Sequence, residues 1–127
     1  MALLLDTHIF FWIVIDSPRL SAGHRQLLLS PPGPVFVSAV SGWEIAAKVR
    51  LGKWPEAAPL LPGLTQSVER AGIRHLPLTI TQAERAGSFE LPHKDPVDRL
   101  LAAQALDQDL TLLTVDPVFA AFGCKVV

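Results

Sequence analysis

The chain has 127 residues, enough for one domain that buries roughly two thirds of the surface exposed by its unfolded form. Its 11 Lys and Arg residues nearly balance 12 Asp and Glu, so no net positive field marks the protein as a nucleic-acid binder. The single cysteine, Cys124, excludes an intrachain disulfide and a cysteine-based zinc site. We therefore expect one domain, residues 1–127, in a reducing compartment such as the cytoplasm.

The N-terminal segment MALLLDTHIFFWIVID is apolar enough to suggest a signal peptide or a membrane helix. However, no Lys or Arg precedes the apolar run, and no small-residue cleavage site follows it. Asp6 and His8 also interrupt it well short of the ~20 residues that a bilayer requires. We expect a buried strand that runs into a helix, and no association with a membrane.

Short apolar runs alternate with helical patterns along the chain. The runs are ALLL (2–5), VFV (35–37), HLPL (75–78) and LTLLTV (110–115), and the final KVV could add a strand. Helices are predicted at 7–15, 21–29, 39–51, 64–72, 81–88 and 96–108, with proline-rich breaks at 30–34 and 54–62. Such alternation indicates an α/β domain with a parallel sheet buried on both faces.

Four acidic residues are placed to meet at one edge of that sheet. Asp6 directly follows ALLL and Asp116 directly follows LTLLTV, so both lie at the carboxyl ends of predicted strands. Glu44 lies in the first turns of the helix after VFVS, and Asp98 lies in the first turn of the 96–108 helix. Because ligands of open parallel sheets bind beyond the carboxyl ends of the strands, we expect these four carboxylates to share a crevice.

Ionised carboxylates crowded into a partly dehydrated crevice need raised pKa values or a counter-charge. Oxygen ligands without cysteine suit Mg²⁺ or Mn²⁺ rather than zinc. The chemistry indicated is metal-assisted phosphoryl transfer or phosphodiester hydrolysis. His93 and Lys94, next to Asp95, could contact the phosphate of such a substrate.

Most of these acids also have a simpler interpretation, because acids are common at helix starts. Patterns typical of N-caps or capping boxes are Asp95–Pro96, Asp116–Pro117, Ser41–Glu44 and Thr81–Glu84. Asp6 is the exception, since it follows a wholly apolar strand with no strong need for a cap. Function is therefore favoured by the joint placement of the four acids rather than by any one of them.

The segment KVRLGKW also has two interpretations. Lys48, Arg50 and Lys53 close to Trp54 could hold single-stranded nucleic acid by charge and stacking. The same residues are typical of a helix C-terminus with Gly52 as the residue after the cap. We favour the second interpretation because it is so common.

Four motifs, in order and spacing, resemble the PIN-domain ribonucleases of the VapC toxin type. They are LLLDTH, SAVSGWEIAAKVRLGK, LPHKDPVDRLLAAQA and LLTVDPVFAAF, which together span essentially the whole chain. The resemblance implies a three-layer α/β/α sandwich around a mostly parallel sheet, and a homodimer. It also implies a toxin that a VapB-type antitoxin silences by inserting into the site.

The resemblance assigns roles to individual residues. Asp6, Glu44, Asp98 and Asp116 match the family's acidic quartet, which holds Mg²⁺ or Mn²⁺ and activates water to cut RNA, leaving 5′-phosphate and 3′-hydroxyl ends. Within it, Asp6, Asp98 and Asp116 are the expected metal ligands, and Glu44 completes the coordination or accepts a proton from water. Residues expected to support the quartet are Thr7, Ser38 and Asp95, and Lys48, His93 and Lys94 are candidates for contact with RNA.

Two alternatives remain open from the residues. A phosphoryl-transfer domain of receiver or phosphatase type also gathers acids at strand ends, although HLPL is followed by Thr79 and residue 8 is His rather than the second Asp of a DxD motif. A non-catalytic interaction module could use the same scaffold, although a decayed site would be expected to lose acids.

Overall fold

Four short parallel strands form the centre of the computed structural model, which describes residues 1–127. They are β1 (Leu3–Leu5), β2 (Val35–Ser38), β3 (Arg74–Leu76) and β4 (Thr111–Leu113), and they lie in the order β3-β2-β1-β4. Leu4 of β1 is in register with Phe36 of β2 and with Leu112 of β4. The chain steps from β1 to β2 and β3 and then returns to the far side of β1, so the strand order reverses between β1 and β4.

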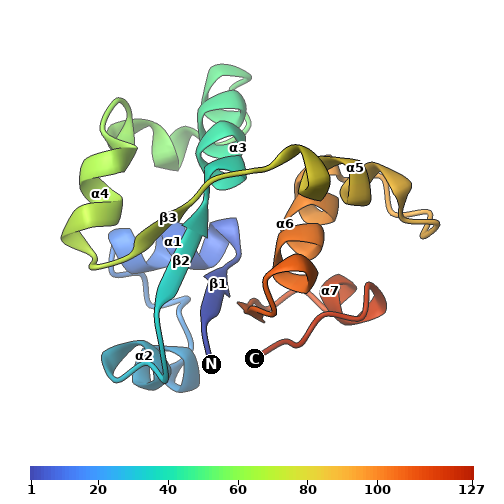
Figure 1. The fold of residues 1–127 in the computed structure, drawn as a ribbon. Helices are drawn as coiled ribbons and strands as arrows, with labels where there is room; N and C mark the ends of the chain where they lie inside the picture. The colour runs from blue at the N-terminus through green and yellow to red at the C-terminus, as the bar shows by residue number, and fades with distance from the viewer.

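Helices cover both faces of the sheet, with α1 and α4 on one side and α6 and α7 on the other (Figure 1). Their bounds are α1 Thr7–Val14, α2 Ala22–Leu29, α3 Ala39–Arg50, a 3₁₀ helix η1 Pro55–Leu60, α4 Leu64–Arg70, α5 Ile80–Ser88, α6 Pro96–Asp107 and α7 Val118–Ala121. The predicted three-layer α/β/α sandwich is confirmed. No helix is both long enough and apolar enough to cross a membrane.

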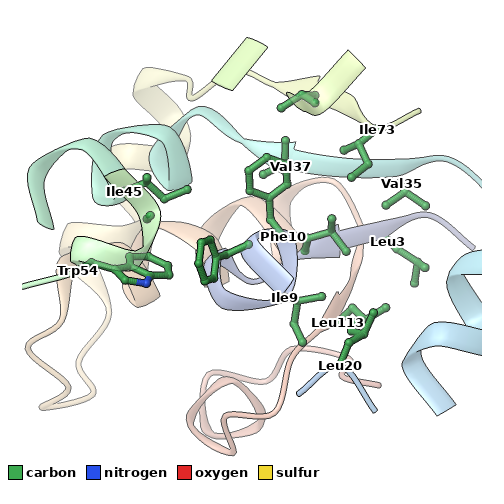
Figure 2. Close-up of a cluster of buried hydrophobic side chains, with 14 residues drawn as sticks. Leu3, Ile9, Phe10, Leu20, Val35, Val37, Ile45, Trp54, Ile73 and Leu113 are labelled. Atoms are coloured by element: carbon green, nitrogen blue, oxygen red, sulfur yellow. The ribbon is translucent and has the colours of Figure 1, made fainter. Parts of the chain in front are cut away.

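Successive side chains of β1 point to opposite faces of the sheet, where the hydrophobic core forms two clusters. Leu3 and Leu5 face α1 and pack with Ile9 and Phe10 in the first cluster, shown in Figure 2. Leu4 points the other way, into the cluster formed by α6 and α7. Because successive strand residues point to opposite faces, a fully apolar strand is what a sheet covered on both sides requires.

A chain of neutral polar side chains crosses the interior between the sheet and the helices α5 and α6. The Ser38 hydroxyl donates to Oε1 of Gln104 at 2.6 Å, and the Gln104 amide donates to Oε1 of Gln82 and to the Pro77 carbonyl, each at 3.2 Å. The Gln82 amide in turn donates to Asp107 at 2.9 Å. Both glutamines are fully buried and bonded, so the network fixes α6 against β2 without leaving an unpaired polar group.

Two predicted capping boxes are wrong. The N-cap of α3 is Ser38, whose hydroxyl accepts from the Val40 amide, so Ser41 lies inside the helix and does not pair with Glu44 as a box. In α5 the box is formed by Thr79 and Gln82. The helix therefore begins at Ile80, and the Thr81–Glu84 pattern lies within its first turns.

The ends of the chain depart little from the prediction. The predicted strand at KVV is reduced to one parallel bridge between Val126 and Leu112. Cys124 is buried, as expected for a structural thiol, and its burial raises the pKa of the thiol to about 11. The thiol is thus protonated and unreactive at neutral pH.

Candidate active site

Asp6 lies where β1 ends, at the reversal of strand order. Its amide donates to the Leu113 carbonyl of β4 at 3.0 Å, and its Oδ1 accepts from the Thr7 amide at 2.7 Å. Asp6 is therefore the N-cap of α1, which corrects the expectation that this acid has no capping role. Burial raises the pKa of Asp6, and the nearby charge of Glu44 raises it further, while the hydrogen bonds from Thr114 and Thr7 and the charge of His8 oppose the rise.

Thr114 joins the ends of β1 and β4. Its hydroxyl donates to Oδ2 of Asp6 at 2.7 Å and accepts from the Asp116 amide at 3.0 Å. One side chain thus fixes both an oxygen of Asp6 and the backbone that carries Asp116. This residue was not predicted from the sequence, although a threonine directly after an apolar run and two residues before an acid was the available signal.

Asp116 is exposed and lies two residues before the last helix. The predicted N-cap is displaced by one residue, because Pro117 rather than Asp116 is the N-cap of α7. Oδ1 of Asp116 still accepts from the Val118 amide at 3.0 Å, and its Oδ2 accepts no hydrogen bond. This bond and the bond through Thr114 together hold Asp116 next to the carboxyl end of β4.

Asp98 is the third residue of α6, behind the N-cap Asp95, whose Oδ1 accepts from the amides of Val97 and Asp98. Oδ2 of Asp98 lies 2.8 Å from Nε2 of His93. Burial raises the pKa of Asp98 to about 6, the charges of Asp95, Asp6 and Asp116 add to this rise, and the bond to His93 opposes it. The charges of acids from four separate segments therefore act on one another at this edge.

Glu44 is only 7% exposed and reaches the site from α3. Its Oε2 pairs with Nζ of Lys48 at 2.9 Å, a helical i to i+4 pair. Nζ of Lys48 also lies 5.9 Å from the centre of the Trp54 ring. Glu44 is thus a buried carboxylate with a cation on one of its two oxygens.

Two residues expected to support the acids bond elsewhere. The Thr7 hydroxyl shares a 2.7 Å hydrogen bond with the Ser41 hydroxyl, which ties α1 to α3, and both residues are fully buried. Ser38 bonds to Gln104 and caps α3. Neither hydroxyl bonds to a carboxylate of the quartet, although the backbone amide of Thr7 donates to Asp6. The side chain that positions Asp6 is that of Thr114.

Arg99 organises the loop that carries His93, a role that was not predicted from the sequence. Its guanidinium donates to the backbone carbonyl of Ala86 near the end of α5 and to three carbonyls of the loop, those of Phe89, Leu91 and His93. It also lies over the Phe89 ring, 5.7 Å from the centre. The planar fork of an arginine suits such multiple donation, so Arg99 fixes the position from which His93 reaches Asp98.

The KVRLGKW segment forms the C-terminal end of α3, which is the interpretation favoured from the sequence. Gly52 has φ of 71°, its amide donates to the Val49 carbonyl, and the Lys53 amide donates to the Lys48 carbonyl at 2.8 Å. These two bonds form a Schellman motif. Trp54 is 7% exposed and stacks on His8, with ring centres 4.6 Å apart, so it offers no open face to a base.

The donor set of this edge consists of carboxylate oxygens, with His93 engaged on Asp98. No three His, Cys, Asp or Glu side chains lie close enough together to hold an ion. Oxygens that accept no hydrogen bond remain on Asp98 (Oδ1), Asp116 (Oδ2) and Glu44 (Oε1). The donor chemistry fits a hard divalent cation, and closer approach of the carboxylates would require one.

Fold and site define a class, a small parallel α/β domain with a group of acidic residues at the reversal of its strand order. Residues 3–123 match the family model described as PIN domain. A curated relative, Ribonuclease VapC22 of Mycobacterium tuberculosis (strain ATCC 25618 / H37Rv), is 30% identical over 116 residues, which cover 89% of this chain and 85% of the relative. The chain belongs to the PIN domain family, in which its motifs and this relative place it with the VapC group.

Solved structures share the fold over nearly the whole chain. VapBC2 from Rickettsia felis, bound to a promoter DNA fragment, matches with a TM-score of 0.71 and 18% identity, covering 100% of this chain and 98% of that one. FitAcB from Neisseria gonorrhoeae matches with a TM-score of 0.67 and 25% identity over 98% and 95% of the two chains. VapC20 from Mycobacterium tuberculosis, described as a Sarcin-Ricin loop cleaving toxin, matches with a TM-score of 0.62 and 20% identity over 96% and 95%.

Proposed function

We propose that this PIN domain is a metal-dependent endoribonuclease and the toxin of a type II toxin–antitoxin pair. The observation that carries the proposal is that carboxylates from four separate segments act on one another through their charges at the reversal of strand order. The names of VapC22 and VapC20 as a ribonuclease and a Sarcin-Ricin loop cleaving toxin support RNA as the substrate. Because the chain belongs to the PIN family, we discard the alternative of a receiver or phosphatase domain.

Asp6, Asp98 and Asp116 are the side chains that would hold Mg²⁺ or Mn²⁺. Asp98 and Asp116 each present an oxygen without a hydrogen bond, and each oxygen of Asp6 retains a lone pair beside its one donor. The bound ion would polarise the scissile phosphate and lower the pKa of a water molecule. A positive charge there would also offset the burial and the neighbouring negative charges that raise the pKa of Asp98.

Residues of the chain orient the acids and accept the proton of the attacking water. Thr114 orients Asp6, and His93 holds Oδ2 of Asp98 so that Oδ1 stays free. Glu44 accepts the proton of the attacking water on its free Oε1, while Lys48 on Oε2 keeps the carboxylate oriented. Attack on phosphorus with departure of the 3′-oxygen, which takes up a proton, leaves 5′-phosphate and 3′-hydroxyl ends.

The three residues that are candidates for contact with RNA differ in whether another side chain already holds them. Lys94 is exposed and takes part in no ion pair, so its charge is available to a phosphate. Lys48 is held by Glu44 and His93 by Asp98. Of the three, Lys94 is therefore the one most directly suited to binding the RNA backbone.

We also propose a VapB-type antitoxin as partner, a homodimer as the assembly and the cytoplasm as the compartment. Solved neighbours described as VapBC2 bound to promoter DNA and as a toxin-antitoxin complex from Klebsiella pneumoniae support the antitoxin. Exposed apolar side chains such as Leu29 and Ile80 support burial against other protein chains.

The test is cleavage of cellular RNA by the purified protein with Mg²⁺ or Mn²⁺, followed by mapping of new 5′ ends. Wild-type protein should cut at defined sites, EDTA should stop it, and Asp98→Asn should abolish it in a folded protein. Asp109→Asn, an exposed carboxylate paired with Lys125 away from the site, should cut normally. Unchanged cleavage by Asp98→Asn would refute the assignment.

A non-catalytic module on the same scaffold makes a different prediction. Calorimetric titration with Mn²⁺ should show uptake in the wild type and a strong loss in Asp6→Asn if the acids hold a metal. A binding module should show no metal uptake that depends on Asp6.

A further inference from the structure

A groove lies between α3 and the start of α6. Its volume is about 410 Å³, within the ~300–1,000 Å³ typical of small-ligand sites. Trp43, Ala47 and Leu51 lie along its α3 wall, and residues 94–97 form the opposite wall. Glu44 lines it too, so the groove includes one of the four proposed catalytic acids.

Trp43 is the unusual side chain in this groove. It is 64% exposed although its neighbour Glu44 is buried, and it pairs with no other aromatic ring. Trp54, which the sequence pointed to as a stacking residue, is buried under His8. An exposed indole in a hollow retains a free face on which a nucleobase can stack.

Lysines border the same groove. Lys48, Lys53 and Lys94 all line it, and Lys48 is already paired with Glu44. Lys53 and Lys94 are exposed and take part in no ion pair. Asp95 lines the groove too, but its Oδ1 accepts from the amides of Val97 and Asp98 at the start of α6. The groove therefore combines an apolar strip with two lysines that are in no ion pair.

We propose that this groove binds a nucleotide of single-stranded RNA that flanks the scissile bond, an inference that rests on the proposed ribonuclease function. The base stacks on Trp43, and the flanking phosphate lies between Lys53 and Lys94. The α3 strip from Trp43 to Leu51 is ~12 Å long at the helical rise, which gives room for such a unit. Stacking is tolerant of base identity, so the groove supplies affinity and register rather than a sequence code.

A second copy of the chain fits the groove less well. A two-fold contact brings the same surface patch against itself, so it would gather the unpaired Lys53 and Lys94 of both copies in one interface. Gathering like charges in an interface is costly. RNA brings the opposite charge to the same positions.

The experiment measures binding of a fluorescein-labelled single-stranded RNA dodecamer of mixed sequence, in EDTA so that no metal-dependent cleavage occurs. Trp43→Ala should weaken the Kd by roughly 5- to 150-fold, and Trp43→Phe should retain most of the affinity. Lys53→Ala and Lys94→Ala should each reduce the slope of log Kd against log salt by about 0.7. Arg50→Ala, an exposed cation at the end of α3 outside the groove, is the matched control.

Sedimentation of the same variants separates RNA from a second copy. The proposal is overturned if folded Trp43→Ala binds the RNA as tightly as the wild type does. It is also overturned if the wild type is a dimer and Trp43→Ala is a monomer with the same RNA affinity per protomer. Absence of RNA binding by the wild type also overturns it. Cleavage in Mg²⁺ is assayed separately. A wild-type protein that binds RNA but does not cleave it contradicts the proposed ribonuclease function. Cleavage by Trp43→Ala with an unchanged KM contradicts only the proposal that the groove binds RNA.

Discussion

Replacing Asp98 by asparagine is expected to stabilise the metal-free protein at neutral pH. The folded state raises the pKa of this carboxyl from 3.8 to about 6, chiefly through burial. Between pH ~4 and ~6 the folded protein therefore holds a proton that the unfolded chain releases, so stability falls as pH rises through this window. The loss is absent below the unfolded pKa and complete above about pH 6, and Asp98→Asn avoids it.

The size of the effect follows from the same pKa. A rise from 3.8 to about 6 corresponds to at most about 3 kcal/mol of unfolding free energy. The side chain keeps 15% of its exposure, so water and salt screen part of the penalty. The first turn of α6 also favours a negative charge by ~0.3–1 kcal/mol, which Asp98→Asn forgoes. We expect a net gain of about 1–2 kcal/mol at pH 7.

Urea unfolding in EDTA from pH 4 to pH 8 measures this gain. Wild type and Asp98→Asn should be equally stable near pH 4 and diverge up to about pH 7. Asp109→Asn is the control, because Lys125 lowers the pKa of that exposed carboxyl and its replacement should bring no gain. The reasoning is refuted if Asp98→Asn is less stable than the wild type at pH 7, or if the difference in unfolding free energy does not depend on pH. Either result would show that the folded state does not penalise the ionised Asp98 carboxylate.

Three further substitutions test other parts of the structure. Thr114→Val removes the hydroxyl that orients Asp6, so RNA cleavage and Mn²⁺ affinity should each fall about 10- to 100-fold, as measured by cleavage kinetics and calorimetry. Arg99→Met leaves one carbonyl of α5 and three of the following loop without the arginine donor and should lower the free energy of unfolding in urea by about 2–4 kcal/mol. Leu101→Ala, at a fully buried position against the sheet, should cost about 2–5 kcal/mol in the same assay while leaving the metal affinity of the folded protein unchanged.

The acids were predictable because their positions depend on strand ends rather than on side-chain detail. An apolar run followed by an acid marks the carboxyl end of a buried strand, and parallel pairing then brings Asp6 and Asp116 to one edge. The same logic located Glu44 and Asp98 at the starts of helices. Burial of both sheet faces followed from the apolar composition of the strands alone.

The supporting contacts were not predictable because they join residues remote in sequence or choose between overlapping local patterns. The bond between Thr114 and Asp6 spans most of the chain. Thr79 with Gln82 and Thr81 with Glu84 both fit the capping-box pattern, and the buried bonds of Gln82 select the first. Trp43 and Trp54 likewise look equivalent in sequence, but the turn after α3 buries only the second.

The interior polar chain from Ser38 through Gln104 to Gln82 has a consequence for how this sequence can diverge. Changing one member leaves a buried amide or hydroxyl unpaired, at a cost of ~1–3 kcal/mol, whereas exchanging the members together for apolar groups of similar shape is nearly neutral. Relatives should therefore keep or lose these three side chains as a set. Single losses should be rare, so covariation among the three positions in an alignment would report how β2 and α6 are held together.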